Sequence, residues 1–297
     1  MMNQRDLQGI YVPVITPFLP DGTLDTPSYR AHVKKLLAHG IQGLVVNGTT
    51  GESPTVSWEE VKALTEETRA LIREQGTSVP IVVGTGTNDT AATVSRTEMA
   101  ARLGADGVLV VVPYYSRPSQ EGIIAHFRQV AQIGIPVIVY EIPARTGVRL
   151  TVDTARTILD IDGVIGMKDS SGGTELVTAL TPLTDKPVLC GEDPCLFDAL
   201  RAGAAGGMTA SANVYTDSFC EAYRLAASGR LEDAGAAFAR LLPLIRLLFQ
   251  EPNPSPLKWL LARQGVIASD AVRLPLTPIT GGLADALERL LSSHERS

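Results

Sequence analysis

The 297-residue sequence has few aromatic residues, few lysines and no surplus of positive charge. Aromatic side chains make up 5% of the chain, and 32 acidic residues against 26 basic ones give a net charge of −6. A chain without a basic surplus has little with which to neutralise a phosphate backbone, so nucleic acid is not expected as a partner. Only six of the basic residues are lysines, and the position of each can therefore be considered separately.

Cysteine, histidine and long apolar runs are also scarce. Cys190, Cys195 and Cys220 lack the spacing of a metal or redox site and are expected to be reduced packing residues. The four histidines form neither an HxxxH nor an HExxH motif, so no histidine metal site is expected. No apolar run approaches the roughly 20 residues that cross a bilayer, and the N-terminus lacks a signal-peptide pattern. These absences predict a cytoplasmic protein without a membrane span.

Eight short apolar segments rich in β-branched residues recur along the first two thirds of the chain. They are almost continuously apolar, which is typical of parallel strands covered on both faces. Amphipathic helical segments separate them, and the repeat of about 25 residues leaves room for one strand, one helix and two loops; this predicts a (β/α)8 TIM barrel. The predicted strands are Ile10–Thr16, Ile41–Asn47, Val79–Gly84, Gly107–Pro113, Pro136–Glu141, Gly163–Lys168, Pro187–Gly191 and Gly206–Ala210.

Only helical patterns continue beyond the last predicted strand, with a break at the proline-rich stretch Glu251–Pro256. We therefore expect a catalytic barrel over residues 1–224 and a C-terminal helical extension over residues 225–297, packed on the barrel or on a neighbouring subunit. A doubly wound open sheet is the alternative fold. It is less favoured because the loop Gly84–Asp89 lacks the third glycine of the dinucleotide-binding fingerprint.

Active sites of such barrels lie at the carboxyl ends of the strands, and one lysine, Lys168, ends an apolar strand. In the low-dielectric mouth of a barrel, desolvation disfavours an ammonium relative to the neutral amine. A neutral amine can attack a 2-keto acid, form a Schiff base and generate an enamine carbon nucleophile. From position alone, an equally good interpretation is that Lys168 reaches solvent or pairs with a carboxylate such as Asp169.

Other strand ends carry groups suited to a small carboxylate substrate. Gly48–Glu52 combines the Thr49 and Thr50 hydroxyls with glycines that allow close backbone approach, although such a segment is as often a plain turn. Tyr140 ends a strand where its phenol is placed to relay protons, or simply to pack. Arg145, five residues later, offers a fork for a second carboxylate, or lies exposed on the surface.

The sequence resembles the pyruvate-dependent lyase family of dihydrodipicolinate synthase and N-acetylneuraminate lyase. The resemblance covers nearly the whole chain, in order and at family spacing. Within the family, Gly-Thr-Thr-Gly-Glu and Arg-Thr-Gly favour the synthase branch, which condenses pyruvate with L-aspartate 4-semialdehyde in lysine biosynthesis. The motifs are Gly48–Ser53, Pro113–Tyr115, Tyr140-x-Ile142-Pro143-x-Arg145-Thr146-Gly147, Gly163-x-Ile165-Gly166-x-Lys168-Asp169 and Asn253-Pro254-x-Pro256-x-Lys258.

The resemblance implies roles for individual residues and a general assembly. It implies a homotetramer built as a dimer of tight dimers, and a reaction that needs neither a metal nor an organic cofactor. Its residue roles are a pyruvate Schiff base on Lys168, a carboxylate site at Thr49 and Thr50, a proton relay of Thr50, Tyr140 and Tyr115 with Tyr115 donated across the dimer interface, a semialdehyde carboxylate on Arg145, and a cavity wall formed by Gly191 and the backbone of Met208.

Two departures from the synthase pattern affect these expectations. The synthases commonly have Asn where this chain has Glu141, and a carboxylate there is expected to neutralise Arg145 and weaken its hold on an acidic second substrate. Lysine-inhibited relatives have a Glu in the helix after the Gly-Thr-Gly-x-Asn loop, where this chain has Ala92, and some have histidines at the positions of Trp58 and Val61. We therefore predict weak or absent feedback inhibition by lysine.

Three other functions are weighed against the synthase. An aldolase or dehydratase acting on a sugar-derived 2-keto acid would share Lys168 and Tyr140 but have a different second-substrate pocket. A non-catalytic barrel homologue should have lost Lys168, Tyr140 or Thr50, and all three are present. A phosphosugar aldolase is less favoured, because Gly203–Gly207 precedes the eighth predicted strand instead of following the seventh or eighth, where barrel phosphate sites form.

Overall fold

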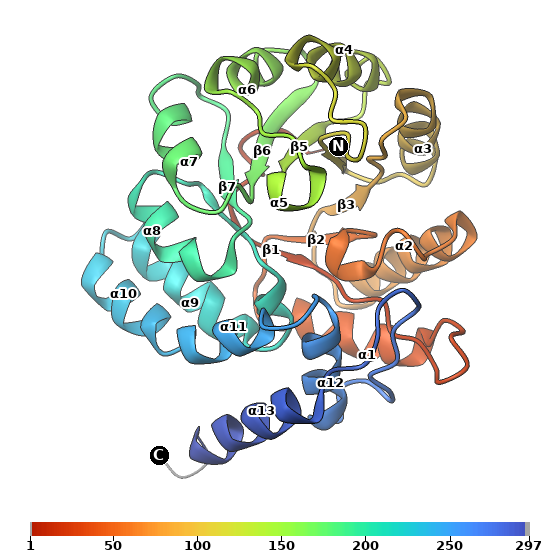
Figure 1. Ribbon diagram of the computed structural model, residues 1–297, viewed down its shortest axis with the longest axis vertical. Coiled ribbons are helices and arrows are strands. Elements are labelled where there is room, and N and C mark those ends of the chain that lie inside the picture. Colours follow the sequence, from red (N-terminus) through yellow and green to blue (C-terminus); the bar gives the residue numbers. More distant parts are fainter. Residues whose placement is uncertain (1, 295–297) are drawn as a thin grey trace.

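Eight short apolar strands form a closed parallel barrel in the computed structural model, which describes residues 2–294 (Figure 1). Each strand pairs with its sequence neighbours, and the eighth returns to pair with the first. The predicted TIM barrel is thereby confirmed, and the alternative open sheet is excluded. The strands are β1 (Gly9–Pro13), β2 (Gly43–Val46), β3 (Ile81–Gly84), β4 (Gly107–Val111), β5 (Val137–Glu141), β6 (Val164–Asp169), β7 (Val188–Cys190) and β8 (Gly206–Met208).

Most strands are shorter than the apolar segments that predicted them. Strand β1 ends at Pro13, yet Val14 and Ile15 beyond it are also buried. Ile15 packs in a cluster that includes Leu257 and other C-terminal residues rather than in the barrel wall. An apolar run reports burial of any kind, whereas a strand ends where its ladder of hydrogen bonds ends.

A ring of helices covers the outside of the barrel (Figure 1). The amphipathic pattern of the sequence predicts helices over Trp58–Glu74 and Val152–Leu159, and α2 and α6 span these same ranges. Helix α2 begins with a capping box, in which Ser57 and Glu60 each accept a hydrogen bond from the backbone N–H of the other. The outer helices are α1 (Thr26–Leu37), α2 (Trp58–Glu74), α3 (Thr90–Arg102), α4 (Gln120–Ala131), α6 (Val152–Leu159), α7 (Glu175–Leu180), α8 (Leu196–Arg201) and α9 (Thr216–Ala227).

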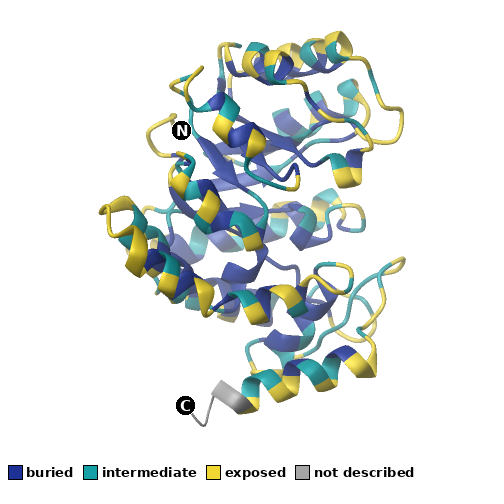
Figure 2. Cartoon of the chain, turned by 60° about the vertical axis from the view of Figure 1, so that its left-hand side comes forward, coloured by how far each residue is buried: buried dark blue, intermediate teal, exposed yellow. Residues whose placement is uncertain are grey.

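Alternate residues of the strands face two different cores. Val139 packs outside the barrel, between strands and helices, whereas Ile138 and Tyr140 belong to the cluster inside it. Figure 2 shows the strands buried along most of their length and the helices exposed on their outer faces. Because side chains alternate along a strand, neighbouring residues at a strand end point to opposite sides of the barrel wall.

Within the described residues, four further helices follow the barrel. They are α10 (Leu231–Ala239), α11 (Leu242–Leu248), α12 (Ser255–Arg263) and α13 (Gly281–His294). Leu248, Leu257 and Leu261 pack with Ile15 and Val214, near the carboxyl ends of β1 and β8. The C-terminal helices therefore cover one side of the end of the barrel at which the active site was predicted. The predicted boundary after residue 224 falls within α9, and the division into two units stays a prediction.

Within the described part of the chain, no helix is both long and apolar enough to pass through a bilayer. Nor do residues 2–294 contain a group of three or more His, Cys, Asp or Glu side chains arranged to hold a metal ion. Cys190 and Cys220 are buried thiols, and Cys195 is partly buried.

Candidate active site

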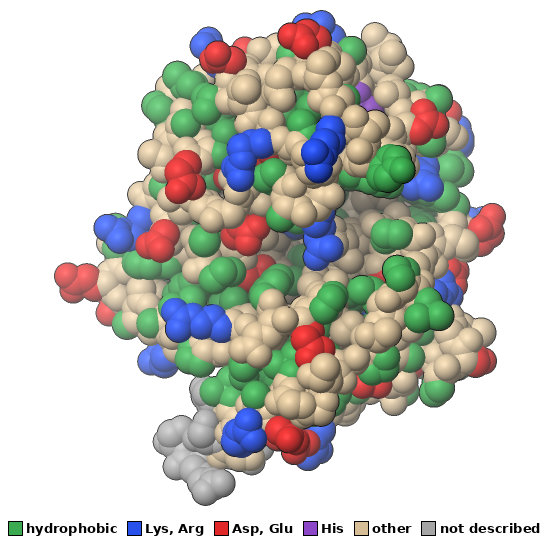
Figure 3. Space-filling view, in the orientation of Figure 1, with side chains coloured by type: hydrophobic (Ala, Val, Ile, Leu, Met, Phe, Trp, Pro, Cys, Tyr) green, Lys and Arg blue, Asp and Glu red, His purple; other side chains and the backbone are tan. Residues whose placement is uncertain are grey.

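A cavity at the carboxyl ends of the strands collects most of the residues predicted from sequence. Short helical turns leave the strands there: η1 (Thr49–Gly51) after β2, α5 (Pro143–Thr146) after β5, η2 (Asp193–Cys195) after β7 and η3 (Ala210–Asn213) after β8. Figure 3 shows this face of the molecule hollowed near its centre, with basic side chains beside the hollow. The cavity is lined by Thr49, Thr50, Tyr140, Arg145, Lys168, Gly191 and Met208, together with residues that the sequence left without a role.

Lys168 and Tyr140 meet inside the barrel because β5 and β6 pair them in register. The Lys168 Nζ lies 4.2 Å from the centre of the Tyr140 ring, and the lysine is 6% exposed. Asp169 follows Lys168 on the strand and therefore faces the other side of the wall, where it accepts a hydrogen bond from the backbone of Ser171. Lys168 consequently neither reaches solvent nor pairs with Asp169. Its amine faces the cavity.

Gly191 allows the wall opposite Lys168 to lie very close to it. A Cβ at this position would lie 2.5 Å from the Lys168 Cε and 2.2 Å from the Ser170 Oγ, far inside van der Waals contact. The Gly191 N–H donates to the Asp169 carbonyl oxygen, which fixes β7 against β6 at this point. Met208, fully buried at the end of β8, lines the same cavity. Only a glycine fits this place without displacing the lysine.

The two threonines sit on a tight turn after β2. Asn47 and Glu52, at either side of η1, both have left-handed backbones, with φ of 60° and 58°. This sharp turn brings Thr49 and Thr50 to the cavity, and Thr50 is 3% exposed. The Thr50 Oγ1 accepts a hydrogen bond of 3.1 Å from the Asn253 Nδ2. The sequence predicts no role for Asn253, which stands out only because it belongs to a motif shared with the family.

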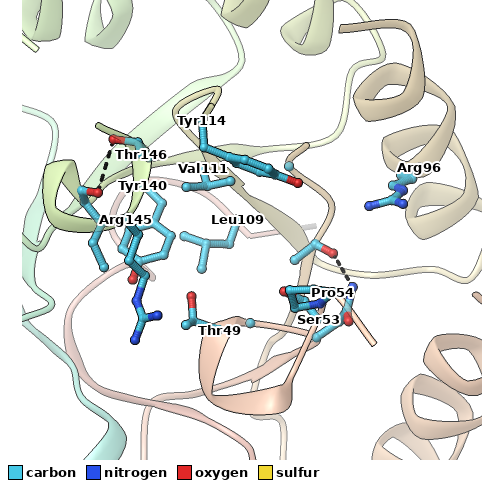
Figure 4. Close-up of a pocket in the computed structure, with 15 residues that line it drawn as sticks. Thr49, Ser53, Pro54, Arg96, Leu109, Val111, Tyr114, Tyr140, Arg145 and Thr146 are labelled. Carbon is cyan, nitrogen blue, oxygen red and sulfur yellow. Dashed lines mark hydrogen bonds between the residues drawn. The ribbon is translucent and has the colours of Figure 1, made fainter. Parts of the chain in front are cut away.

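Arg145 extends from the single-turn helix α5 and lines the cavity near Thr49 and Tyr140 (Figure 4). The expectation that Glu141 neutralises it is wrong. Glu141 is the last residue of β5 and points outward, where it is fully buried and its Oε1 accepts a hydrogen bond from the Leu150 N–H. The strand alternation that sends Tyr140 inward sends Glu141 away from Arg145.

Two carboxylates, Glu192 and Asp193, line the cavity, and the sequence singled out neither. Burial raises the pKa of Glu192, while the positive charges of Lys168 and Arg145 oppose that shift. Next to it, the buried Asp193 accepts hydrogen bonds from the backbone N–H groups of Ala210 and Ser211, joining the turns after β7 and β8. The sequence feature that could have identified both residues is their position directly after Gly191, just beyond the end of β7.

Tyr115 is the one predicted site residue that does not line the cavity. It lies in the loop after β4, has a left-handed backbone with φ of 71° and is 89% exposed. A tyrosine so exposed on a constrained loop has its ring free to contact another molecule. Its predicted place across a dimer interface stays a prediction.

A second cavity adjoins the first and shares Thr49, Tyr140 and Arg145 with it. Figure 4 shows Arg96 entering from the opposite side, on α3. The Arg96 guanidinium lies 5.7 Å from the centre of the Trp58 ring. The described residues lining this cavity include two arginines and no carboxylate.

Comparison with known proteins assigns this arrangement to a family. The profile of the Dihydrodipicolinate synthetase family matches residues 6–294. This chain belongs to that family. It is 35% identical to 4-hydroxy-tetrahydrodipicolinate synthase 2 of Clostridium acetobutylicum over 96% of this chain and 99% of that protein. The predicted family resemblance is confirmed.

Solved structures of the family have the same fold. The dihydrodipicolinate synthase of Thermotoga maritima superposes with a TM-score of 0.92 at 35% identity, covering 96% of this chain and 98% of that one. The chloride-inhibited dihydrodipicolinate synthase of Acinetobacter baumannii, solved in complex with pyruvate, superposes with a TM-score of 0.91 at 34% identity, covering the same shares of the two chains.

Proposed function

We propose that this chain is a Schiff-base-forming lyase that condenses pyruvate with L-aspartate 4-semialdehyde to 4-hydroxy-tetrahydrodipicolinate. The observation that carries the proposal is the Lys168 amine, buried inside the barrel beside Tyr140 and facing a cavity with two threonines and an arginine. The names of its relatives and the pyruvate complex of the Acinetobacter baumannii synthase support this reading.

The side chains around the cavity supply the nucleophile, the proton-transfer groups and the carboxylate-binding groups that this condensation requires. The Lys168 amine attacks the keto carbon of pyruvate, and loss of water leaves a Schiff base; loss of a methyl proton then gives an enamine. The enamine carbon bonds to the aldehyde carbon of the second substrate, whose oxygen takes up a proton. The amino group of that substrate then attacks the Schiff-base carbon, which closes the ring and displaces the Lys168 amine. Thr50 and Tyr140 supply hydroxyl groups for these proton transfers, and the backbone and hydroxyls of Thr49 and Thr50 receive the pyruvate carboxylate. Arg145 receives the carboxylate of the semialdehyde.

A two-part experiment tests the proposal. Reduction with borohydride in the presence of pyruvate, followed by intact mass and peptide mapping, should show one pyruvyl adduct on Lys168. A coupled assay with aspartate semialdehyde should then show condensation. An adduct without condensation would favour a sister enzyme acting on another aldehyde or a sugar-derived 2-keto acid. If no lysine forms an adduct, both the synthase and the sister-enzyme interpretations are wrong.

Arg145→Ala is expected to affect the second substrate selectively. Losing a charge-assisted pair with a carboxylate should raise KM for the semialdehyde by about 30-fold, while adduct formation with pyruvate stays close to that of the parent protein. Initial rates over both substrate concentrations measure the split. Arg156→Ala, which removes an exposed arginine of α6, is the matched control. An equal rise in the KM for pyruvate would contradict a role of Arg145 in binding the second substrate alone.

Lysine is expected to inhibit weakly or not at all. Ala92 lies in the first turn of α3 and offers an ammonium group no carboxylate. Arg96, on the same helix, adds a positive charge to the second cavity, beside Trp58. An α-amino group brought there meets repulsion instead of an ion partner. Assays with rising lysine concentration check this, and strong inhibition at submillimolar lysine would contradict it.

The proposal extends to cofactor use, assembly and location. The covalent adduct on Lys168 supplies the electron sink for the chemistry, so we propose that no metal or organic cofactor takes part. The 89% exposure of Tyr115 supports a tight dimer in which this ring reaches the partner's site, and two such dimers forming a homotetramer. A cytoplasmic location suits the three unpaired thiols.

A further inference from the structure

The motif Asn253-Pro254-x-Pro256-x-Lys258 lies outside the barrel, in the loop before α12 and in α12 itself. Both of its polar side chains reach the turn that carries Thr50. The Asn253 Nδ2 donates to the Thr50 Oγ1 over 3.1 Å, and the Lys258 ammonium forms an ion pair with Glu52. The C-terminal extension thus contacts the predicted proton relay directly.

The ion pair anchors this contact in a buried place. Lys258 and Glu52 are 0% and 2% exposed. Lys258 also donates to the Ala271 carbonyl oxygen over 2.8 Å, and Glu52 accepts from the Arg273 backbone N–H over 3.0 Å. Breaking a buried ion pair by removing one partner is costly, so the turn after β2 and the C-terminal segment hold a fixed relative position. Asn253, five residues before Lys258, is therefore held in register with Thr50.

The chemistry of the amide sets the direction of the Thr50 hydroxyl. An amide NH2 group only donates, so the Thr50 oxygen acts as acceptor towards Asn253. The single hydroxyl proton of Thr50 must then point elsewhere. With Thr50 3% exposed and lining the cavity with Tyr140 and Lys168, the direction left open to that proton is the cavity.

We propose that Asn253 is a positioning residue that fixes the Thr50 hydroxyl as a proton donor towards the cavity. The inference rests on the proposed Schiff-base function, in which Thr50 belongs to the proton relay. The C-terminal extension then completes the active site by controlling a proton, in addition to packing on the barrel.

Asn253→Asp tests this directly. An ionised carboxylate at this place accepts the Thr50 proton and turns the hydroxyl away from the cavity. We expect kcat to fall by about 10²-fold, with KM for both substrates changed by less than about threefold. Because a protonated carboxyl can donate again, the kcat of Asn253→Asp should recover as the pH is lowered, which a purely structural defect would not do. Gln250→Glu, the same amide-to-carboxylate change at an exposed position nearby, is the matched control.

A double-mutant cycle secures the result if Asn253→Asp folds poorly. Asn253→Ala and Thr50→Val are combined, and the double variant should be no slower than Thr50→Val alone, because Asn253 acts through the Thr50 hydroxyl. Additive losses would overturn the proposal, as would unchanged kcat in both Asn253 variants or a rise confined to the KM of the semialdehyde. A parent protein that forms no pyruvate adduct would instead refute the proposed function itself.

Discussion

Lys168→Arg is expected to lower kcat by at least about four orders of magnitude, because a guanidinium cannot lose a proton in the protein and cannot attack the pyruvate carbonyl. The substitution keeps the positive charge inside the barrel, so the loss reports the nucleophile and not the electrostatics of the cavity. The coupled assay measures the rate. Borohydride trapping with intact mass measures the adduct, which should be absent.

The matched control is Lys62→Arg, at a side chain that is 60% exposed on α2. It should retain both the adduct and the rate. Lys258 is the only other lysine buried in the described chain, but its ammonium is held by Glu52 outside the cavity lining. An adduct mapped to Lys258, or turnover by Lys168→Arg near the parent rate, would contradict the assignment of the nucleophile.

Glu141→Gln is expected to stabilise the protein at mildly alkaline pH. Glu141 and Asp169 are paired across β5 and β6, and both are buried on the outer side of the wall. Among the described residues, the Glu141 Oε2 and the Asp169 Oδ2 have no hydrogen-bond partner. Burial, with a further contribution from the charge of Asp169, raises the pKa of Glu141 to about 7. Ionising both carboxyls therefore costs the folded state free energy.

The sign of the pH dependence follows from that pKa. The folded protein holds the Glu141 proton more tightly than the unfolded chain, so stability falls as pH rises from about 4.5 to about 7. A glutamine has no such cost, and its Nε2 can donate to Asp169. At about pH 8 the free energy of unfolding of Glu141→Gln should exceed that of the parent by on the order of 3 kcal/mol.

Chemical denaturation at several pH values measures this difference. The gap between Glu141→Gln and the parent should shrink as the pH is lowered and close near pH 4.5, the ordinary pKa of a glutamate. Glu221→Gln, at an exposed position of α9, should give no comparable gap at any pH. A gap that stays constant with pH would assign the effect to packing instead of ionisation.

The sequence was sufficient for the barrel and for Lys168 for physical reasons. Parallel strands buried on both faces must be continuously apolar, and Val137–Val139 and Gly107–Val111 show this without any tertiary information. The side chain of a lysine at the end of such a strand lies either in the mouth of the barrel or against a neighbouring carboxylate. Position alone could not decide between the mouth and Asp169, since that depends on which face of β6 the residue occupies.

The contacts of Glu141 and Asn253 could not be predicted from the sequence. Glu141 is four residues from Arg145, yet strand alternation and the turn at α5 separate the two side chains. Asn253 is 203 residues from Thr50 and touches it. Neither periodicity nor spacing reports a contact made across so long a stretch of chain, because it depends on how the C-terminal helices pack.

The long sequence separation between Thr50 and Asn253 determines when their contact can form during synthesis. During synthesis, β8 is complete at Met208, and every strand of the barrel is then present. Asn253 and Lys258 have yet to be made, and without them the turn that carries Thr50 has neither its amide partner nor its ion pair. A nascent chain that has already closed its barrel should therefore turn over substrate far more slowly than the finished protein until the C-terminal segment is released and docks.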